Sequence, residues 1–255
     1  MENALLIGLS RQVALTRELE AVANNIANLN TTGFKADGTV FEEFLMPMAR
    51  DNQFSGRDSR VSFVRDRATW HNLSHGPIQR TENPLDVAIE SDAFFVVQTA
   101  RGERYTRNGA FQINATGELV TSEGDRVLGE SGPIKFQSTD NSIGIGRDGS
   151  IRVREGSNAT VDTSRGKLRF ASFDRPQQLQ KDGGSRFLAP PGVETLPAAR
   201  VAVTQGALEK SNVHAVLEMT RMIEITRAYS QIATLLQQQS DMRRNVIEKL
   251  SSVPV

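Results

Sequence analysis

Two histidines four residues apart, His71 and His75, have the spacing closest to that of a metal site in this sequence. On one face of a helix, such spacing lets two imidazoles bind the same ion. Gly76 and Pro77 would end any helix directly after His75, and residue 72 is asparagine rather than the glutamate of a metalloprotease motif. We therefore expect surface-loop histidines and no metal.

A glycine-rich string, GIGRDG at residues 144–149, matches the GxGxxG pattern of dinucleotide-binding loops. Such a loop joins a strand to a helix whose N-terminus receives the pyrophosphate. Here SIRVR follows at residues 150–154, and its apolar and polar residues alternate as in a strand. The sequence therefore predicts a hairpin turn at Asp148-Gly149 and no cofactor.

The sequence also lacks the residue patterns of other common catalytic sites. The absence of cysteine excludes disulfides, thiolate metal sites and thiol nucleophiles. The carboxylates form no recognisable acid–base pair, and no serine stands in a GxSxG motif. We predict that the protein is not an enzyme and has no catalytic or cofactor-binding residues.

Composition argues against further classes of protein. The 255 residues carry 30 Lys+Arg and 30 Asp+Glu, and this balance argues against a nucleic-acid partner. No apolar run is long enough to span a membrane, so we expect no membrane insertion. The apolar stretch Ala4–Leu9 is too short for a signal peptide and follows Glu2 rather than a positive charge, so we expect no cleaved signal.

Two long helices are predicted, one toward each end of the sequence. Each carries an apolar seam with steps of three and four residues and a second apolar stripe. In the first helix, about residues 3–29, the seam is Leu15, Leu19, Val22, Ile26 and Leu29, and the stripe is Leu6, Leu9, Val13, Ala23 and Ala27. In the second, about residues 213–250, the seam is Met222, Ile225, Tyr229, Ile232 and Leu236, and the stripe is Val216, Met219, Ile223 and Ala233.

The region between the helices has short β-prone runs separated by Gly-containing turns, which is typical of antiparallel sheets. The predicted fold class is therefore α+β, with long terminal helices forming a helical-hairpin or coiled-coil layer and a central, mainly antiparallel β domain. The predicted divisions are an N-terminal helix at 1–35, a linker or extended arm at 36–82, the β domain at 83–205 and a C-terminal helix at 206–255.

The second stripes leave two interpretations open. If the helices pair only with each other, one stripe on each stays in water, and exposed apolar stripes of this length mark interaction surfaces. Alternatively, a two-helix layer packed on the sheet uses both stripes inside one subunit.

Asparagines gather at the end of the first helix, at Asn24, Asn25, Asn28 and Asn30. A buried amide at a helix seam lowers stability but fixes register and partner choice. Asn28 and Asn30 are also explained as helix stop signals, together with Gly33, whereas Asn24 and Asn25 are explained less well in this way.

Four groups of residues, spread in order along the chain, carry a family resemblance. They are ANNIANLNTTGFK at 23–35, NPLDVAIESDAFFVV at 83–97, RYTRNGAFQINATGELVT at 104–121, and QGALEKSNV with EMTRMIEITRAY at 205–213 and 218–229. These segments resemble flagellar basal-body rod and hook proteins, the axial proteins of the bacterial flagellum. The sequence departs from the family where Ser91 and Ala93 replace glycines.

The resemblance implies a structural subunit of the basal-body rod, in which the terminal helices of many copies form a tube that transmits torque. It implies as partners other copies, neighbouring rod proteins and the flagellar type III export apparatus, and as location the periplasmic rod, reached without a cleaved signal. Phe41 and Leu45 fit a short export motif of the family. The expected assembly-interface residues are Leu15, Leu19, Val22, Asn24, Asn25, Ile26, Asn28, Gly33, Met222, Ile225, Tyr229, Ile232 and Leu236.

Within the family, the start of the sequence and the pair of motifs PLDVAI and GPI favour the proximal rod. A distal-rod or hook subunit is the first alternative. An enzyme acting on cell-wall polymer is the second, since a rod must cross that layer.

Overall fold

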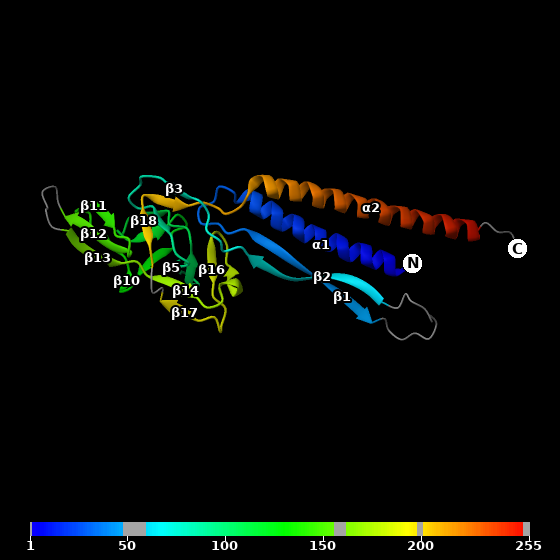
Figure 1. Ribbon diagram of the computed structural model, residues 1–255, viewed down its shortest axis with the longest axis horizontal. Coiled ribbons are helices and arrows are strands. Elements are labelled where there is room, and N and C mark those ends of the chain that lie inside the picture. Colours follow the sequence, from blue (N-terminus) through cyan, green and yellow to red (C-terminus); the bar gives the residue numbers. More distant parts are fainter. Residues whose placement is uncertain (1, 48–59, 156–161, 198–200, 252–255) are drawn as a thin grey trace. The chain divides into compact units, whose positions relative to one another are not determined.

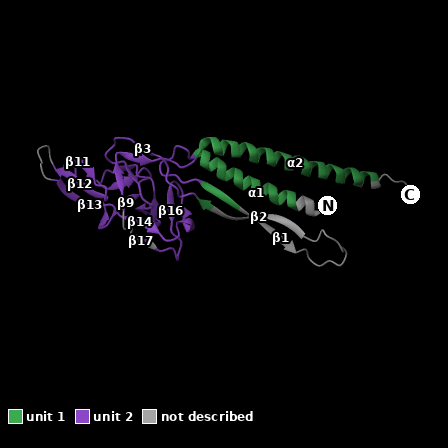
Figure 2. Ribbon diagram, viewed as in Figure 1, with its two compact units in different colours: residues 1–27, 37–71, 214–255 green, residues 28–36, 72–213 purple. Residues whose placement is uncertain are grey.

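The computed structural model describes residues 2–47, 60–155, 162–197 and 201–251. The chain forms two compact units, coloured separately in Figure 2. Unit 1 consists of residues 1–27, 37–71 and 214–255, and unit 2 of residues 28–36 and 72–213. The chain therefore passes from one unit to the other four times.

Unit 1 contains two long helices that lie side by side, α1 (Glu2–Ala27) and α2 (Ala215–Ser251) (Figure 1). They run in opposite directions, since Glu18 pairs with Arg221 and Gly8 faces Leu236. A Cβ atom at Gly8 would lie 2.7 Å from Cδ2 of Leu236, so glycine permits the close approach of the helices at this point.

The same unit holds an antiparallel strand pair, β1 (Asp37–Pro47) and β2 (Arg60–His71), which packs against α1. The register places Gly38 opposite Trp70, whose indole ring lies on the glycine. A bulge between Val40 and Phe41 shifts the pairing by one residue.

Unit 2 is built from short strands, and every pair in it is antiparallel. Its largest sheet has ten strands, with β15-β16-β6-β5-β9-β8-β7 in order and β10, β14 and β17 beside this path; smaller sheets are β11-β12-β13, β18-β4 and β19-β3. The strands are β3 (Ile78–Arg80), β4 (Val87–Ile89), β5 (Phe94–Thr99), β6 (Gly102–Thr106), β7 (Phe111–Ile113), β8 (Leu119–Thr121), β9 (Arg126–Gly129), β10 (Gly132–Pro133), β11 (Asp140–Ile145), β12 (Ser150–Glu155), β13 (Asp162–Lys167), β14 (Phe170–Phe173), β15 (Gln180–Lys181), β16 (Arg186–Leu188), β17 (Thr195–Pro197), β18 (Val203–Gln205) and β19 (Ala207–Glu209), and a 3-10 turn covers Pro176–Gln178.

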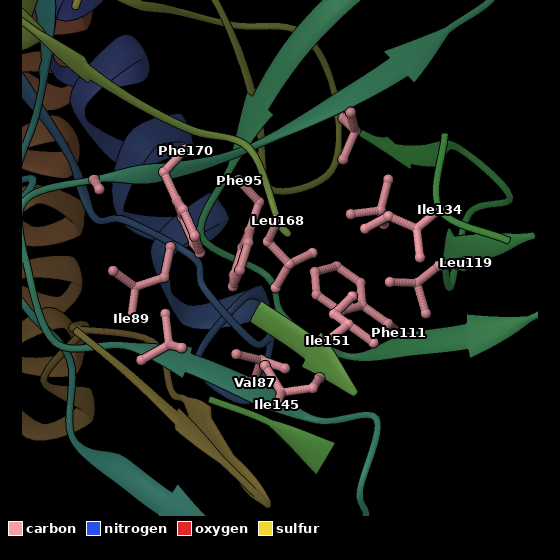
Figure 3. Packing of buried hydrophobic residues seen from close by; sticks show 14 of the residues in the cluster. Val87, Ile89, Phe95, Phe111, Leu119, Ile134, Ile145, Ile151, Leu168 and Phe170 are labelled. Carbon is pink, nitrogen blue, oxygen red and sulfur yellow. The ribbon is translucent and has the colours of Figure 1, made fainter. Parts of the chain in front are cut away.

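The main core of unit 2 lies where these small sheets meet (Figure 3). Phe95 of β5 stacks edge-on against Phe111 of β7, with ring centroids 4.9 Å apart, and also contacts Phe170 of β14. Ile145 and Ile151, from β11 and β12, close the same cluster. The whole cluster draws on three sheets, and its burial joins small sheets that would be marginal alone.

The predicted fold class is wrong as a description of this architecture. The described residues contain only two α-helices, and most of their elements are strands divided among several sheets. The helices share unit 1 with β1 and β2, so they do not form a coiled-coil layer of their own. The pairing skips Arg67, so the bulge lies in β2. Apolar and polar residues do not alternate regularly in either strand, so the sequence pattern did not reveal this strand pair.

The predicted domain divisions differ from the two units in one respect, because each unit is assembled from separate pieces of the chain. The segment 36–82, predicted as a linker or arm, contains β1, β2 and β3. Neither of the described helices has an apolar stretch that could cross a bilayer.

The glycine-rich string is a hairpin turn, as predicted. It joins β11 to β12, and the amide of Gly149 donates to the carbonyl of Gly146 over 2.9 Å. A strand rather than a helix follows the turn, so the pattern lacks the helix N-terminus that a dinucleotide loop requires.

The ion pair between Asp140 and Arg165 predicts how the stability of the fold changes in acid. Its buried carboxylate accepts two hydrogen bonds from Arg165, at 2.6 and 2.9 Å, which hold the pKa of Asp140 below its usual range. A depressed folded pKa adds stability that is present above about pH 4 and is lost as the pH falls through the folded value. We expect Asp140→Asn to lower the urea midpoint at pH 7, with the difference from the natural chain shrinking toward pH 2.

The control is Asp162→Asn, which removes a half-exposed partner of Arg154 in the same sheet and is expected to change the midpoint little. A constant difference between Asp140→Asn and the natural chain from pH 7 to pH 2 would contradict the prediction.

Candidate assembly site

The predicted seams lie largely inside unit 1. Val22 of α1 and Ile225 of α2 are buried, whereas Tyr229 is more than one-third exposed. The remaining seam residues are partly buried: Leu15, Leu19, Ile26, Met222, Ile232 and Leu236. The seams thus pack within the subunit, and their contacts with other subunits stay a prediction.

The second stripes face solvent. On α2, Val216 is 77% exposed and Ile223 50% exposed, and Met219 lies between them on the same face. Further along α2, an exposed group follows with steps of seven and four residues: Leu235, Met242 and Val246. On α1, Ile7, Leu9 and Val13 are exposed. Ala23 and Ala27 of the predicted stripes are exposed as well, Ala233 is partly buried, and the Leu6 side chain lies outside the described part of the structure. Coverage of these stripes by other subunits stays a prediction.

Asn25 forms its hydrogen bonds within unit 1. Its side chain is 1% exposed, donates to the carbonyl of Asp37 and accepts from the amide of Asp37, both over 2.8 Å. Like a residue pair in an antiparallel sheet, the Asn25 side chain and the Asp37 backbone exchange one donor and one acceptor bond. These bonds hold the start of β1 on α1. The Asp37 carboxylate in turn lies 2.6 Å from Nδ1 of His71.

The other predicted residues have varied surroundings. Asn24 is exposed and Asn28 is partly buried, with its side-chain oxygen accepting from Thr31 over 3.1 Å. Phe41 and Leu45 lie in β1, and their side chains are outside the described part of the structure. Whether they form an export motif stays a prediction.

A buried ionic group in unit 2 centres on Glu209 at the end of β19. Lys35 Nζ lies 2.6 Å from Glu209 Oε1 and donates also to the carbonyl of Ser74 over 2.7 Å. The amide of Gly76 donates to the same carboxylate oxygen over 2.9 Å. The side chains of Lys35 and Glu209 are 0% and 1% exposed.

A second buried cation, Arg107, lies 3.5 Å from Glu209 Oε2. Its guanidinium also contacts Nδ1 of His75 at 3.3 Å, stacks over the ring of Phe94 and lies 4.0 Å from the exposed carboxylate of Asp92. Its Nε has no hydrogen-bond partner among the described residues. We call Lys35, Arg107, Glu209, His75 and Asp92 the charge cluster.

In the charge cluster, burial and the negative charge of Glu209 shift the pKa values of the two cations in opposite directions. Burial lowers the pKa of the Lys35 ammonium and of the Arg107 guanidinium, whereas the charge of Glu209 acts against both shifts. One buried carboxylate therefore stabilises two buried cations, and removal of that carboxylate would leave both without their main partner.

The segment that carries Lys35 is held along its length by unit 2. The amide of Gly33 donates to the carbonyl of Glu209 over 2.8 Å, and the carbonyls of Thr32 and Lys35 accept from Ser185 and Lys181. Gly33 has a positive φ of 68°, and a Cβ atom there would lie 2.4 Å from the amide nitrogen of Asn108. Only glycine fits this close backbone approach.

The charge cluster was not predicted as a site, yet the four resembling segments meet in it. Lys35 comes from the first, Asp92 from the second, Arg107 from the third and Glu209 from the fourth. Their position in these segments was the available signal.

The two histidines belong to different settings. His71 is a buried strand residue bonded to Asp37, which corrects the expected surface loop, and His75 is partly exposed beside Asp92. Within the described ranges, no group of His, Asp and Glu side chains is arranged to hold a metal ion.

Substitutions in the charge cluster should have unequal effects. Glu209→Gln leaves two buried cations without an anion, and we expect it to lower the free energy of unfolding by about 3–5 kcal/mol. Lys35→Met leaves the carboxylate with Arg107 and Gly76, so we expect a loss of about 1–2 kcal/mol. Urea unfolding followed by circular dichroism measures both. Equal losses would show that Glu209 does not balance both cations.

Gly33→Ala should release residues 28–36 from their site. Gly124 has a similar φ of 88° but no atom within 4 Å of its Cβ position, so Gly124→Ala isolates the backbone penalty of about 1–2 kcal/mol. We expect Gly33→Ala to cost about 1–3 kcal/mol more because of the clash, with faster proteolysis within residues 28–36. Equal unfolding free energies for the two variants would contradict the predicted close approach.

Comparison with known proteins connects these segments to one family. Family models described as "Flagella basal body rod protein", "Flagellar hook protein FlgE/F/G D1 domain" and "Flagellar basal body rod FlgEFG protein C-terminal" match residues 5–35, 88–153 and 204–249. Together they cover more than half of the chain.

Whole-length relatives agree. The chain is 36% identical to the flagellar basal-body rod protein FlgF of Caulobacter vibrioides, over 99% of this chain and 100% of that protein. It is 35% identical to FlgF of Mesorhizobium japonicum, over 99% of both chains. FlgG of Agrobacterium fabrum is 33% identical over 97% of this chain and 99% of its own length.

These relatives are structural proteins of the flagellar basal body, so the prediction that the protein is not an enzyme is confirmed. Membership also implies assembly with other axial proteins of the flagellum. Convergence of the four resembling segments on the charge cluster, the exposed helix stripes and the full-length matches lead to one conclusion: the chain belongs to the flagellar basal-body rod protein family and is a structural subunit of the rod.

Proposed function

We propose that the protein occupies the proximal part of the rod, in the periplasm, and carries torque through contacts between subunits. The relatives named FlgF support the proximal position, since three of them are 33–36% identical over at least 98% of this chain. The relatives named FlgG match at 28–33% identity, so a distal-rod or hook role is not favoured.

The exposed apolar residues of α1 and α2 carry the proposal for assembly. Val216, Met219 and Ile223 form a continuous apolar face on the first turns of α2, and transfer of such side chains from water to a protein contact is worth about 1.5–3 kcal/mol each when complete. In our proposal neighbouring rod subunits cover this face.

The partly buried seam supports the same assembly in a different way. Ile225, Ile232 and Leu236 join α2 to the rest of unit 1, so a force applied to the exposed face passes into the packed interior of the subunit. A head-to-tail contact that does not close on itself produces a helical array, which suits a rod.

Export through the flagellar type III apparatus, without removal of a signal, is part of the proposal. It is supported by the fit of Phe41 and Leu45 to a short export motif. Nucleic acid is not proposed as a partner, because positive and negative charges are equal in number.

Ile223→Asp tests the assembly face. Because Ile223 is half exposed, we expect the subunit to fold with unchanged stability, whereas a carboxylate buried in a subunit contact should abolish rod assembly and motility. Swimming assays and purification of basal bodies measure the effect. The matched control is Gln238→Asp, an exposed polar position on the same helix, which should remain motile.

Motile cells with intact rods in the Ile223→Asp strain would overturn the assembly proposal. Measurement of the unfolding free energy of the purified variant separates this result from a folding defect.

A further inference from the structure

A second polar group in unit 2 lies next to the charge cluster and is centred on the side chain of Asn212. Its Oδ1 accepts from the amide of Ala36 over 2.8 Å. Its Nδ2 donates to the carbonyl of Asn72 over 2.8 Å and to the carbonyl of Ser74 over 3.1 Å. The residue is 8% exposed, so these bonds are largely protected from water.

The three residues that meet at this amide are the ends of three chain connections. Residue 36 precedes the passage into β1, residue 72 follows the passage out of β2, and residue 212 precedes the passage into α2. They are separated by 36 and 140 positions in the sequence. A further bond joins the first two directly, since the amide of Asn72 donates to the carbonyl of Ala36 over 2.8 Å.

A carboxamide is suited to this position, because it donates and accepts at the same time. An aspartate would keep the acceptor for Ala36 but lose the donor to Asn72 and Ser74. An alanine would remove the side-chain partner of the Ala36 amide and of the Asn72 carbonyl, whereas the Ser74 carbonyl would keep its bond from Lys35. Polar groups left without a partner are costly where water is excluded.

We propose that Asn212 acts as a clamp, a single side chain that ties three of the four chain connections of unit 2 into one cooperative structure. In this arrangement the connections open together or not at all. The proposal concerns the isolated subunit and does not depend on the position of the subunit in the rod.

The chain offers a matched control in Gln205. Its side-chain amide also makes three hydrogen bonds to backbone groups of unit 2. It accepts from the amide of Ile145 over 3.1 Å and donates to the carbonyls of Pro84 and Ile143 over 2.7 and 2.8 Å. None of these partners lies at a chain connection. Gln205→Ala therefore removes a similar network without touching the clamp.

Amide hydrogen exchange of the purified full chain tests the proposal. In Asn212→Ala, we expect the amide of Asn72 to exchange at least about tenfold faster, together with that of Ala36, while Val97 in the core strand β5 keeps its rate. The Asn72 amide is the informative probe, since its own acceptor, the carbonyl of Ala36, is unchanged by the substitution.

Two results would overturn the clamp. If only Ala36 exchanges faster, Asn212 supplies one hydrogen bond and no coupling. If Gln205→Ala accelerates Ala36 and Asn72 equally, the effect is general loosening of unit 2.

A second variant keeps the test decisive if Asn212→Ala does not fold. Asn212→Asp retains the acceptor for Ala36 and removes both donor bonds, so we expect fast exchange at Asn72 with partial protection at Ala36. Natural exchange rates at both positions in this variant would also overturn the proposal.

Discussion

The carboxylate of Glu209 holds two buried cations that come from distant parts of the chain, and the organisation of unit 2 around its chain connections depends on it. Lys35 and Arg107 are 174 and 102 positions away from Glu209 in the sequence. Neither cation would be stable in this dry environment alone, since desolvation of an unpaired charge is costly. The ion pair of Lys35 with Glu209 therefore ties residues 28–36 to β19 in the folded unit.

In α1 and α2, apolar side chains are divided between a packed face and an exposed face. Their seams are packed inside unit 1, where Gly8 lets α1 approach Leu236 closely, and their second stripes remain in water. Apolar residues at the same helical spacing thus serve internal packing on one face and exposure on another. For a member of a family that assembles into a rod, this division separates the stability of the subunit from its affinity for neighbours.

Local patterns predicted local structure well and distant contacts poorly. The absence of proline and glycine from Ala207 to Val253, with the steps from Met222 to Leu236, predicted α2. The alternation after Gly149 predicted the β11–β12 hairpin. The strand pair β1–β2 was missed, because neither strand alternates regularly and the register skips Arg67 of β2. Periodicity cannot show such a shift, since the partner strand fixes it.

The charge cluster illustrates the same limit. In sequence, Lys35 and Glu209 look like ordinary surface residues, because burial is the normal fate of neither type. Their partnership arises from the fold and has no local periodic signal. Asn25 was predicted as an amide at a helix seam between subunits, and that role stays a prediction. Its partner within unit 1, Asp37, could not be identified from spacing along the chain.

The interleaved division of the chain has a consequence for the order in which the subunit matures. Residues 72–213 form most of unit 2 in one uninterrupted stretch, whereas unit 1 needs residues from both ends of the sequence. Closing so large a loop carries an entropy penalty that local contacts avoid. The β unit can therefore form while the polypeptide is still emerging, and the helical unit is completed last, after α2 arrives.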